Sequence, residues 1–526
     1  MRKRIVSFAF LLGFFALNST SFAAFHRPKL IVLVVIDQFR ADYLTRFESQ
    51  FLPPIQKDGK LGGFRYLMTH GAYFPQAKYD VMNSVTAVGH MTISTGSYPY
   101  QSGIVANEWL NQDTQKEIYC TEDPQFPLLG GNVEALSDGR SPRNLIGSTI
   151  GDQLKLSYPH SKVLSLSIKD RAAILLGGHT ADLALWLNRK AGVWTSSEYY
   201  LPTKKLPSWV ERLNEKTRAS GKLVEKLGEK SNYKDSIASP IGNEMTAEAV
   251  EAALSAFQLG GGNDPDLFAV SLSSHDAAGH KYGPNSPEME EMTISDDRTL
   301  SRILNAVQAT TPDGLKNTLI VLTGDHGAAP NEEWSKLIRL PYEKIDTRQA
   351  QDQLNKLLET QFGKPSTGSW VVAEMGFHFY LNQPEIRSKG LDLGKMEAVG
   401  KSFLKTIPGV AHVFTSSEVI SGRLPPGKFE RQILHSYFPG RSGDLVVIPR
   451  PFVTPRLGNP KATTHVTGYS YDQTVPILIA GSQVHSGTYA SQAEVIDIAP
   501  TVTFLAGVIA PSSSEGRVLS EVINIK

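Results

Sequence analysis

Two Asp–His pairs stand just after apolar, β-branched runs in this sequence. Asp276 and His280 are separated by three residues in Asp276-Ala-Ala-Gly-His280, and Asp325 and His326 are neighbours between two glycines. The i, i+4 spacing of the first pair can place both side chains on one side of a turn, and the glycines let the second pair turn sharply. Carboxylate oxygen with imidazole nitrogen is a ligand set that zinc accepts. Each pair alone also fits a polar surface turn.

Asp37 and His465 complete a set of three Asp and three His. Asp37 ends the apolar run 29–36, where a helix N-cap is the alternative role. His465 lies in Thr463-Thr-His-Val-Thr-Gly468 and taken alone is a loop histidine. Six ligands suffice for two three-ligand zinc sites, each with a position left open for substrate or nucleophile.

A hydroxyl group stands between these elements in the sequence. Thr86 lies in Asn83-Ser-Val-Thr-Ala-Val-Gly-His90, at the expected start of a helix. Backbone N–H groups and the dipole at a helix N-terminus favour a phosphate there, and metal coordination makes a threonine hydroxyl a competent nucleophile. The alternative is that Thr86 only caps the helix.

The elements that must position these residues alternate along the chain. Continuous apolar runs at 29–36, 163–168, 267–272 and 319–322 are typical of strands buried on both faces, and strands resume at 444–448 and 475–479. Helical patterns lie at 246–259 and 295–309, and a helix closes the chain at 495–504. This alternation predicts an α/β fold with a central, mostly parallel sheet sandwiched by helices.

In such a sheet ligands bind at the carboxyl ends of the strands. The first four runs end in polar residues that can do chemistry: Asp37, Lys169, Arg171, Asp276, Asp325 and His326. We therefore expect one site at that edge. Two segments, 190–245 and 340–435, break the pattern, and we interpret them as insertions that cap or flank the sheet rather than as independent domains.

The first residues carry a targeting pattern. A basic start, Met1-Arg-Lys-Arg, precedes the apolar run 5–17, and small residues around Ala23 fit signal peptidase cleavage. We expect residues 1–23 to be a signal peptide and the mature protein to be periplasmic or secreted; the alternative is an uncleaved anchor. No later segment reaches the roughly 18 apolar residues of a spanning helix.

Composition excludes some classes of function. The formal net charge is +1, which gives no basic field of the kind that binds a nucleic-acid polymer. Cys120 is the only cysteine, so the chain forms no internal disulfide. With 526 residues, 41% of them hydrophobic, the chain has ample material for a large core.

Taken together and in this order, the motifs resemble the alkaline phosphatase superfamily. The order is similar to that of its nucleotide pyrophosphatase/phosphodiesterase branch, over nearly all of residues 24–526, which we expect to form one alkaline phosphatase-like catalytic domain. The resemblance implies two zinc ions, one held by Asp276, His280 and His465 and the other by Asp37, Asp325 and His326. It also implies that the Thr86 oxygen reaches the second ion and carries a phosphothreonine intermediate.

Three further residues bear on the substrate. Ser167-Ile-Lys169-Asp-Arg171 and Asn107 resemble the signature of the PafA-type periplasmic alkaline phosphatases, which implies that Asn107, Lys169 and Arg171 bind the non-bridging phosphate oxygens. A planar guanidinium can hold two oxygens and an ammonium adds a point charge, which favours a monoester dianion. An exposed charged loop is the alternative for this stretch.

We accordingly expect an alkaline phosphatase that hydrolyses small phosphate monoesters and releases inorganic phosphate, as a monomer without a nucleic-acid partner. A phosphodiesterase or nucleotide pyrophosphatase using the same site is the alternative enzyme. A catalytically silent metal- or phosphate-binding protein is a further alternative, although binding alone does not need the Thr86 hydroxyl. A sulfatase is a poor fit, because Cys120-Thr-Glu-Asp-Pro124 has neither the proline nor the arginine at the spacing of the C/S-x-P-x-R motif.

Overall fold

A nine-stranded mixed sheet forms the centre of the fold within the part of the chain that the structure describes. This structure is a computed structural model, and it describes residues 27–130, 139–221 and 234–524, so the predicted signal peptide at 1–23 lies outside the described residues. In sheet order the strands are β17 (Gly487–Thr488), β2 (Ala72–Lys78), β16 (Thr474–Ala480), β9 (Thr318–Gly324), β1 (Leu30–Ile36), β8 (Asp266–Leu272), β5 (Val163–Ser167), β6 (Leu183–Asn188) and β7 (Val193–Thr195).

The four apolar runs that the sequence predicts as strands are neighbours in this sheet. They are β9, β1, β8 and β5, and each pairs with the next in parallel, so their carboxyl ends meet at one edge. Strand β16 is antiparallel to both β2 and β9, and β7 is antiparallel to β6. The predicted α/β fold with a mostly parallel central sheet is thus confirmed.

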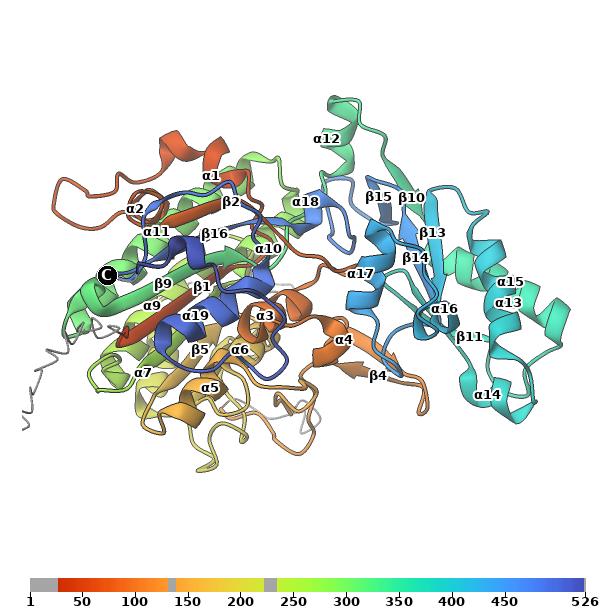
Figure 1. Ribbon diagram of the computed structural model, residues 1–526, viewed down its shortest axis with the longest axis horizontal. Coiled ribbons are helices and arrows are strands. Elements are labelled where there is room, and N and C mark those ends of the chain that lie inside the picture. Colours follow the sequence, from red (N-terminus) through yellow and green to blue (C-terminus); the bar gives the residue numbers. More distant parts are fainter. Residues whose placement is uncertain (1–26, 131–138, 222–233, 525–526) are drawn as a thin grey trace, which may run out of the picture.

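Helices cover both faces of the sheet (Figure 1). Alternate residues of β1 enter opposite cores: Val32 and Val34 pack into one and Leu33 and Val35 into the other. The helices of the first face include α2 (Phe64–His70), α7 (Ser208–Ala219), α9 (Pro240–Phe257) and α11 (Pro287–Thr310). Those of the second include α3 (Thr86–Thr95), α5 (Ile150–Ser157), α6 (Asp170–Gly177) and α19 (Ile498–Ala506).

Two of these helices begin earlier than the apolar pattern predicts. Helix α9 starts at Pro240 after the capping residue Ser239, and α11 starts at Pro287 after Ser286. A serine cap followed by proline at the first helical position is a start signal that lies outside the apolar periodicity. None of the helices in the described ranges is long and apolar enough to cross a membrane.

A second, four-stranded antiparallel sheet lies apart from the central one (Figure 1). Its strands, in order, are β11 (Val371–Met375), β12 (His378–Leu381), β14 (Leu445–Pro449) and β13 (Val410–Thr415). Helices α13 (Thr347–Phe362) and α15 (Leu393–Leu404) pack on it around a core of its own. The strand predicted at 444–448 is β14 of this sheet, whereas that predicted at 475–479 is β16 of the central one.

Shorter elements connect these parts. They are α1 (Tyr43–Arg46), α4 (Pro99–Ser102), β3 (Glu108–Asn111), β4 (Lys116–Tyr119), α8 (Lys234–Ile237), α10 (Ser274–Tyr282), α12 (Glu332–Leu337), β10 (Glu343–Ile345), α14 (Gln383–Ser388), α16 (Ser416–Ile420), α17 (Lys428–Ser436), β15 (Val453–Pro455) and α18 (Ser470–Gln473). Of these, α10 and the β3–β4 hairpin carry residues of the candidate site.

Candidate metal centre

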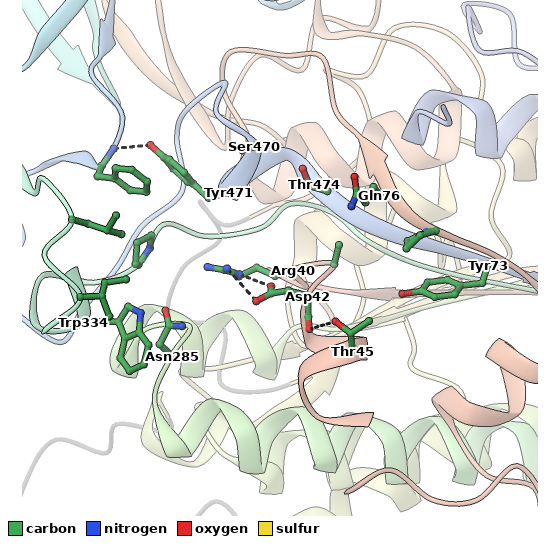
Figure 2. A pocket seen from close by; sticks show the side chains of 16 residues that line it. Arg40, Asp42, Thr45, Tyr73, Gln76, Asn285, Trp334, Ser470, Tyr471 and Thr474 are labelled. Carbon is green, nitrogen blue, oxygen red and sulfur yellow. Dashed lines mark hydrogen bonds and ion pairs between the residues drawn. The ribbon is translucent and has the colours of Figure 1, made fainter. Parts of the chain in front are cut away.

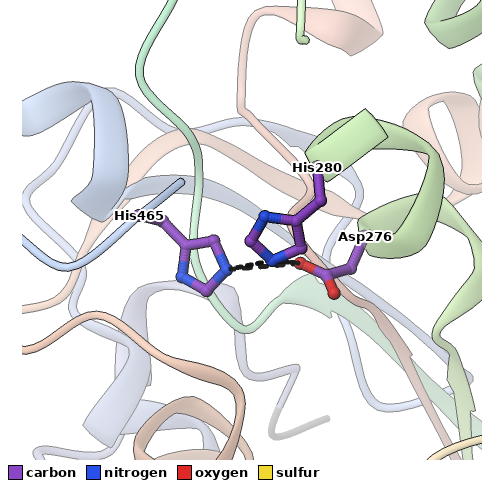
Figure 3. A group of neighbouring side chains, drawn as sticks. All are labelled: Asp276, His280 and His465. Carbon is purple, nitrogen blue, oxygen red and sulfur yellow. Dashed lines mark hydrogen bonds and ion pairs between the residues drawn. The ribbon is translucent and has the colours of Figure 1, made fainter. Parts of the chain in front are cut away.

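The first group of candidate ligands gathers where β8 ends. Asp276 and His280 lie on α10, which follows β8, and His465 reaches them from the loop before α18 (Figure 3). Oδ1 of Asp276 lies 3.2 Å from Nε2 of His280 and 3.3 Å from Nε2 of His465. The two imidazole Nε2 atoms are 3.1 Å apart. Three ligand atoms therefore converge on one point, as a metal site requires.

The second group lies at the ends of the neighbouring strands β1 and β9. Asp37 follows β1, and Asp325 and His326 follow β9. Nε2 of His326 lies 3.5 Å from Oδ1 of Asp37 and 3.4 Å from Oδ2 of Asp325. The rings of His326 and His465 stack with their centroids 3.5 Å apart, so the two groups are in contact.

All three imidazoles turn the same nitrogen toward the centre. Nδ1 of His280, His326 and His465 lies 2.9, 3.0 and 2.6 Å from the backbone carbonyl oxygens of Thr463, Gly327 and Ser84 respectively. A carbonyl accepts only, so Nδ1 carries the proton and Nε2 is left with a lone pair. Histidine ligands of metals are oriented in this way.

Buried polar atoms without a hydrogen bond mark the second group. Oδ1 of Asp37, Oδ2 of Asp325 and Nε2 of His326 are buried and make no hydrogen bond, and Oδ2 of Asp37 has an ion pair with Lys169. Such atoms are costly in a protein interior unless something compensates for them. A divalent cation at this point would be bound by all of them, so the residues fit the metal that the sequence predicts.

The ionisation of these groups is shifted by burial and by their neighbours. Burial and the charge of Asp37 raise the pKa of Asp325 to about 7. Burial and the nearby His465 hold the pKa of His326 well below its usual value, so its ring is neutral. Burial would raise the pKa of Asp276, but His280 and Lys169 outweigh it and hold that pKa well below the usual range.

The predicted nucleophile Thr86 is the first residue of α3 and is 1% exposed. Its Oγ1 lies 3.2 Å from Nζ of Lys169 and 3.4 Å from a terminal nitrogen of Arg171. Nζ of Lys169 also lies 2.7 Å from Oδ2 of Asp37 and 2.5 Å from Oδ2 of Asp276. The hydroxyl, both ligand groups and two cations are thus in one place.

Helix α3 approaches the second group closely because it carries a glycine there. A Cβ at Gly89 would lie 2.2 Å from the carbonyl oxygen and 2.7 Å from Cβ of Asp325. His90, on the next turn position, lies with Nδ1 3.2 Å from Oδ2 of Asp325, and its Nε2 contacts Oγ of Ser271 at 2.9 Å. His90 therefore contacts the ligand Asp325 from behind.

Asn107 directly precedes strand β3 and contacts the start of helix α3. Its Oδ1 accepts a hydrogen bond of 2.9 Å from the backbone N–H of Ala87. This contact fixes the orientation of the amide and turns its NH2 group, a donor, toward other partners.

A hydrogen-bond network holds Arg171. Oδ1 of Asp170 accepts from the Tyr119 hydroxyl at 2.6 Å, and Oδ2 accepts from Nε of Arg140 at 2.7 Å. A terminal nitrogen of Arg171 lies 3.3 Å from the Tyr119 hydroxyl. Burial lowers the pKa of Arg171, but Tyr119 and Asp170 outweigh it and keep the guanidinium charged.

Sequence reasoning missed two residues of this site. Gln38, directly after Asp37, hydrogen-bonds a carboxylate of each ligand group. Tyr119 enters from strand β4 and has no signal of its own, because nothing in its local sequence distinguishes it from a packing tyrosine. The only indication for Gln38 in the sequence is that it directly follows the candidate ligand Asp37.

Two other histidines lie outside the ligand groups. His275 precedes the ligand Asp276, and its Nδ1 contacts Oδ2 of Asp296 at 2.6 Å. His179 contacts the carbonyl of Gly147 at 3.1 Å.

Two cavities differ in their relation to the centre. One of about 550 Å³ is lined by Lys169 and Arg171 and by the β6–β7 turn with Arg189. Another of about 610 Å³, shown in Figure 2, lies between Trp334 and Tyr471 and has no candidate ligand in its lining. The first therefore adjoins the predicted phosphate-binding cations.

Known proteins resemble this chain over most of its length. Residues 31–468 match the family described as type I phosphodiesterase / nucleotide pyrophosphatase. The alkaline phosphatase PafA of Elizabethkingia meningoseptica is 31% identical over 94% of this chain and 95% of the relative. A calcium-transporting ATPase of Myroides odoratus is also 31% identical, over 97% of each chain. A crystal structure of wild-type alkaline phosphatase PafA matches with a TM-score of 0.84 at 30% identity, covering 94% of this chain and 99% of that chain.

These findings agree with the resemblance drawn from the motifs. The family match spans all six candidate metal ligands, from Asp37 to His465. The fold is shared with the PafA structure over nearly the whole chain. The chain therefore belongs to the type I phosphodiesterase / nucleotide pyrophosphatase family.

Proposed function

We propose that this chain is an alkaline phosphatase that hydrolyses phosphate monoesters at a two-zinc site, with Thr86 as the nucleophile. One observation carries the proposal. Nζ of Lys169 lies within 3.2 Å of the Thr86 hydroxyl and of one carboxylate from each ligand group, Asp37 and Asp276. A nucleophile, two metal-binding groups and a cation at one point form the arrangement that phosphoryl transfer needs.

Zinc is proposed from the chemistry of the donors. Two carboxylates with one imidazole, and one carboxylate with two imidazoles, are oxygen–nitrogen sets that leave a fourth position open. When bound, the two ions would lower the pKa of the Thr86 hydroxyl and stabilise charge on the attacking and departing oxygens.

The chain's own residues then supply positioning. Oγ1 of Thr86 loses its proton to water and forms a bond to phosphorus as the ester P–O bond breaks, and the leaving alkoxide takes up a proton from water and departs as the alcohol. Arg171 binds two non-bridging oxygens with its planar fork, Lys169 adds a point charge, and the NH2 group of Asn107 donates to another oxygen. Water then attacks the phosphothreonine, which frees Thr86 and inorganic phosphate.

The preference for monoesters rests on these cations. A monoester dianion carries one more charged oxygen than a diester, and the Tyr119–Asp170 network keeps the Arg171 guanidinium charged and aimed toward Thr86. The name of the PafA relative, alkaline phosphatase, agrees with this substrate class. The description of the matching family favours the second candidate, a phosphodiesterase or nucleotide pyrophosphatase that uses the same site.

The proposed setting follows from the first residues and from the substrate. We propose that residues 1–23 direct export to the periplasm, where the enzyme acts as a monomer on small phosphate esters.

A matched pair of substrates tests the proposal. The zinc-loaded protein is assayed with a phosphate monoester and a diester of the same leaving group, as wild type and as Lys169→Ala/Arg171→Ala. We expect a monoester preference that falls by on the order of 100-fold or more in the double variant. Arg302→Ala, which breaks an ion pair with Glu251 on the far helices, is the control. A diester preference in the wild type would favour the second candidate.

A further inference from the structure

Gln38 hydrogen-bonds a carboxylate from each ligand group through two different donors. Its backbone N–H donates to Oδ1 of Asp325 at 2.9 Å, and its side-chain Nε2 donates to Oδ1 of Asp276 at 2.8 Å. It is also covalently attached to Asp37. All three carboxylates of the centre are therefore linked through this single residue.

The backbone of Gln38 has a conformation that residues with a side chain rarely adopt. Its φ is 65°, in the left-handed region, although the residue is not glycine. Strand β1 ends at Ile36, so this turn lets the N–H of Gln38 reach Asp325 after β9 while its side chain reaches Asp276 after β8. An unfavourable conformation that serves two contacts at a candidate site indicates a functional constraint.

The space for the side chain is prepared by the opposite helix. Gln38 is 0% exposed, and a Cβ at Gly279 of α10 would lie 1.8 Å from its Oε1. Gly279 stands between the two ligands Asp276 and His280. The ligand helix thus has a glycine where the amide enters.

The contact with Asp276 involves the oxygen that faces the other ligands. Oδ1 of Asp276 is also the carboxylate oxygen that lies 3.2 Å from Nε2 of His280 and 3.3 Å from Nε2 of His465. A carboxylate oxygen has two lone pairs, so it can bind a metal with one and accept the Gln38 amide with the other. Nζ of Lys169 takes Oδ2, which leaves Gln38 to set the direction of Oδ1.

We propose that Gln38 is a positioning residue that sets the carboxylate of Asp276 for metal binding and couples the two metal-binding groups. Hydrogen-bond partners behind metal ligands typically change metal affinity by about 10- to 100-fold when they are removed. The proposal rests on the two-metal site proposed above.

Metal binding to the purified protein tests this role directly. Gln38→Met keeps the side-chain length and removes the donor, and Gln38→Glu keeps the shape. The binding of Zn²⁺ alone is followed by calorimetry and by competition with a chelator, and the melting temperature of each metal-free variant is recorded. We expect the ion at Asp276, His280 and His465 to bind about 10- to 100-fold more weakly in both variants. The other ion should bind nearly as in the wild type, because both variants keep the backbone N–H that donates to Asp325.

Two further variants separate this role from a general loss of stability. Gln351→Met removes a comparable amide hydrogen bond, to the Val371 carbonyl, in the second sheet and should leave zinc binding unchanged. Gly279→Ala should reproduce the Gln38 defect, because the added methyl displaces the amide while alanine favours the helix. Gly279→Ala also tests the proposal if the Gln38 variants do not fold.

Unchanged affinity for both ions in the Gln38 variants, or an equal loss in Gln351→Met, would overturn the proposal. A wild-type protein that binds no divalent ion would overturn the two-metal site itself, and the role of Gln38 with it.

Discussion

The two ligand groups touch each other but differ in their access to water. The side chains of Asp37, Asp325 and His326 are 0% exposed, whereas that of His280 in the other group is 40% exposed. In the buried group three ligand atoms have neither a hydrogen bond nor an ion pair with Lys169, namely Oδ1 of Asp37, Oδ2 of Asp325 and Nε2 of His326, whereas Oδ1 of Asp276 in the open group accepts from Gln38. Solvent does not reach the charge of the buried group, which Lys169 balances in part, whereas solvent reaches His280 in the open group. We expect the buried ion to be held tightly and the open ion to exchange.

The largest expected effect is the loss of an imidazole from either group. His326→Ala and His280→Ala should each lower monoester turnover, His326→Ala by on the order of 1,000-fold. Added imidazole should restore part of the activity of His280→Ala, because that side chain is open to solvent, and none of His326→Ala. The measurement is the rate of product release as imidazole is added. Equal rescue of both variants would contradict the difference between the groups.

Release of metal to a chelator should also distinguish the two groups. A chelator added to the zinc-loaded protein should release the two ions in two phases of similar amplitude, the first from the open group. Metal release is followed with a zinc indicator and compared with activity. His280→Ala should lose the fast phase and so identify it; a single phase in the wild type would show that the groups do not differ.

The pH dependence of the metal-free protein should reveal the buried group. Because the pKa of Asp325 is raised to about 7 in the folded state, that state binds a proton which the unfolded state, with a pKa near 3.8, has already released. Stability is then fully present below the unfolded pKa and is lost as the pH rises through 7. We expect the melting temperature to fall by a few degrees from pH 5 to pH 8, and less in Asp325→Asn.

A control for this titration lies in the second sheet. Burial raises the pKa of Asp444 to about 7 as well, far from the metal groups. Asp444→Asn should reduce the pH dependence with and without zinc, whereas the Asp325 contribution should disappear when zinc is bound. A pH dependence that zinc leaves unchanged would argue against metal binding by Asp325.

The smallest expected effect is that of the Tyr119 hydroxyl, and it tests whether Arg171 acts independently of the metal-binding groups. Tyr119→Phe removes the hydroxyl that contacts Arg171 and Asp170 but touches no ligand. Turnover of a monoester should fall by about 2- to 10-fold, the value of one hydrogen bond, with metal content unchanged. Tyr199→Phe, which removes a hydroxyl contact to the His179 carbonyl, is the control. A change in bound zinc in Tyr119→Phe would show that the two sets of residues are not independent.

Much of the candidate site was predictable because parallel strands end at one edge. The continuous apolar runs of β1, β8 and β9 identify buried parallel strands, and the residues just after them, such as Asp37, Asp276 and Asp325, must then lie together. His465 follows no strand of the central sheet, and only the resemblance to a family assigned it to the group with Asp276 and His280.

Other features leave no local signal. Strand β14 has the same apolar character as β16, so the sequence could not assign one to the second sheet and the other to the first. Strand β14 pairs with β12 and β13, and both of these strands lie in the long segment 340–435. Gln38 depends on a backbone turn with positive φ and on the space at Gly279, which arise only when two strands and α10 are assembled.

The most direct test of the account is to trap the covalent intermediate. The zinc-loaded enzyme is mixed with a phosphate monoester, quenched in acid during turnover and digested for mass spectrometry. We expect the peptide with Thr86 to gain one phosphoryl group, and we expect both this gain and turnover to disappear in Thr86→Ala. A phosphoryl group on another residue, or a Thr86→Ala variant that still turns over substrate at the wild-type rate, would contradict it.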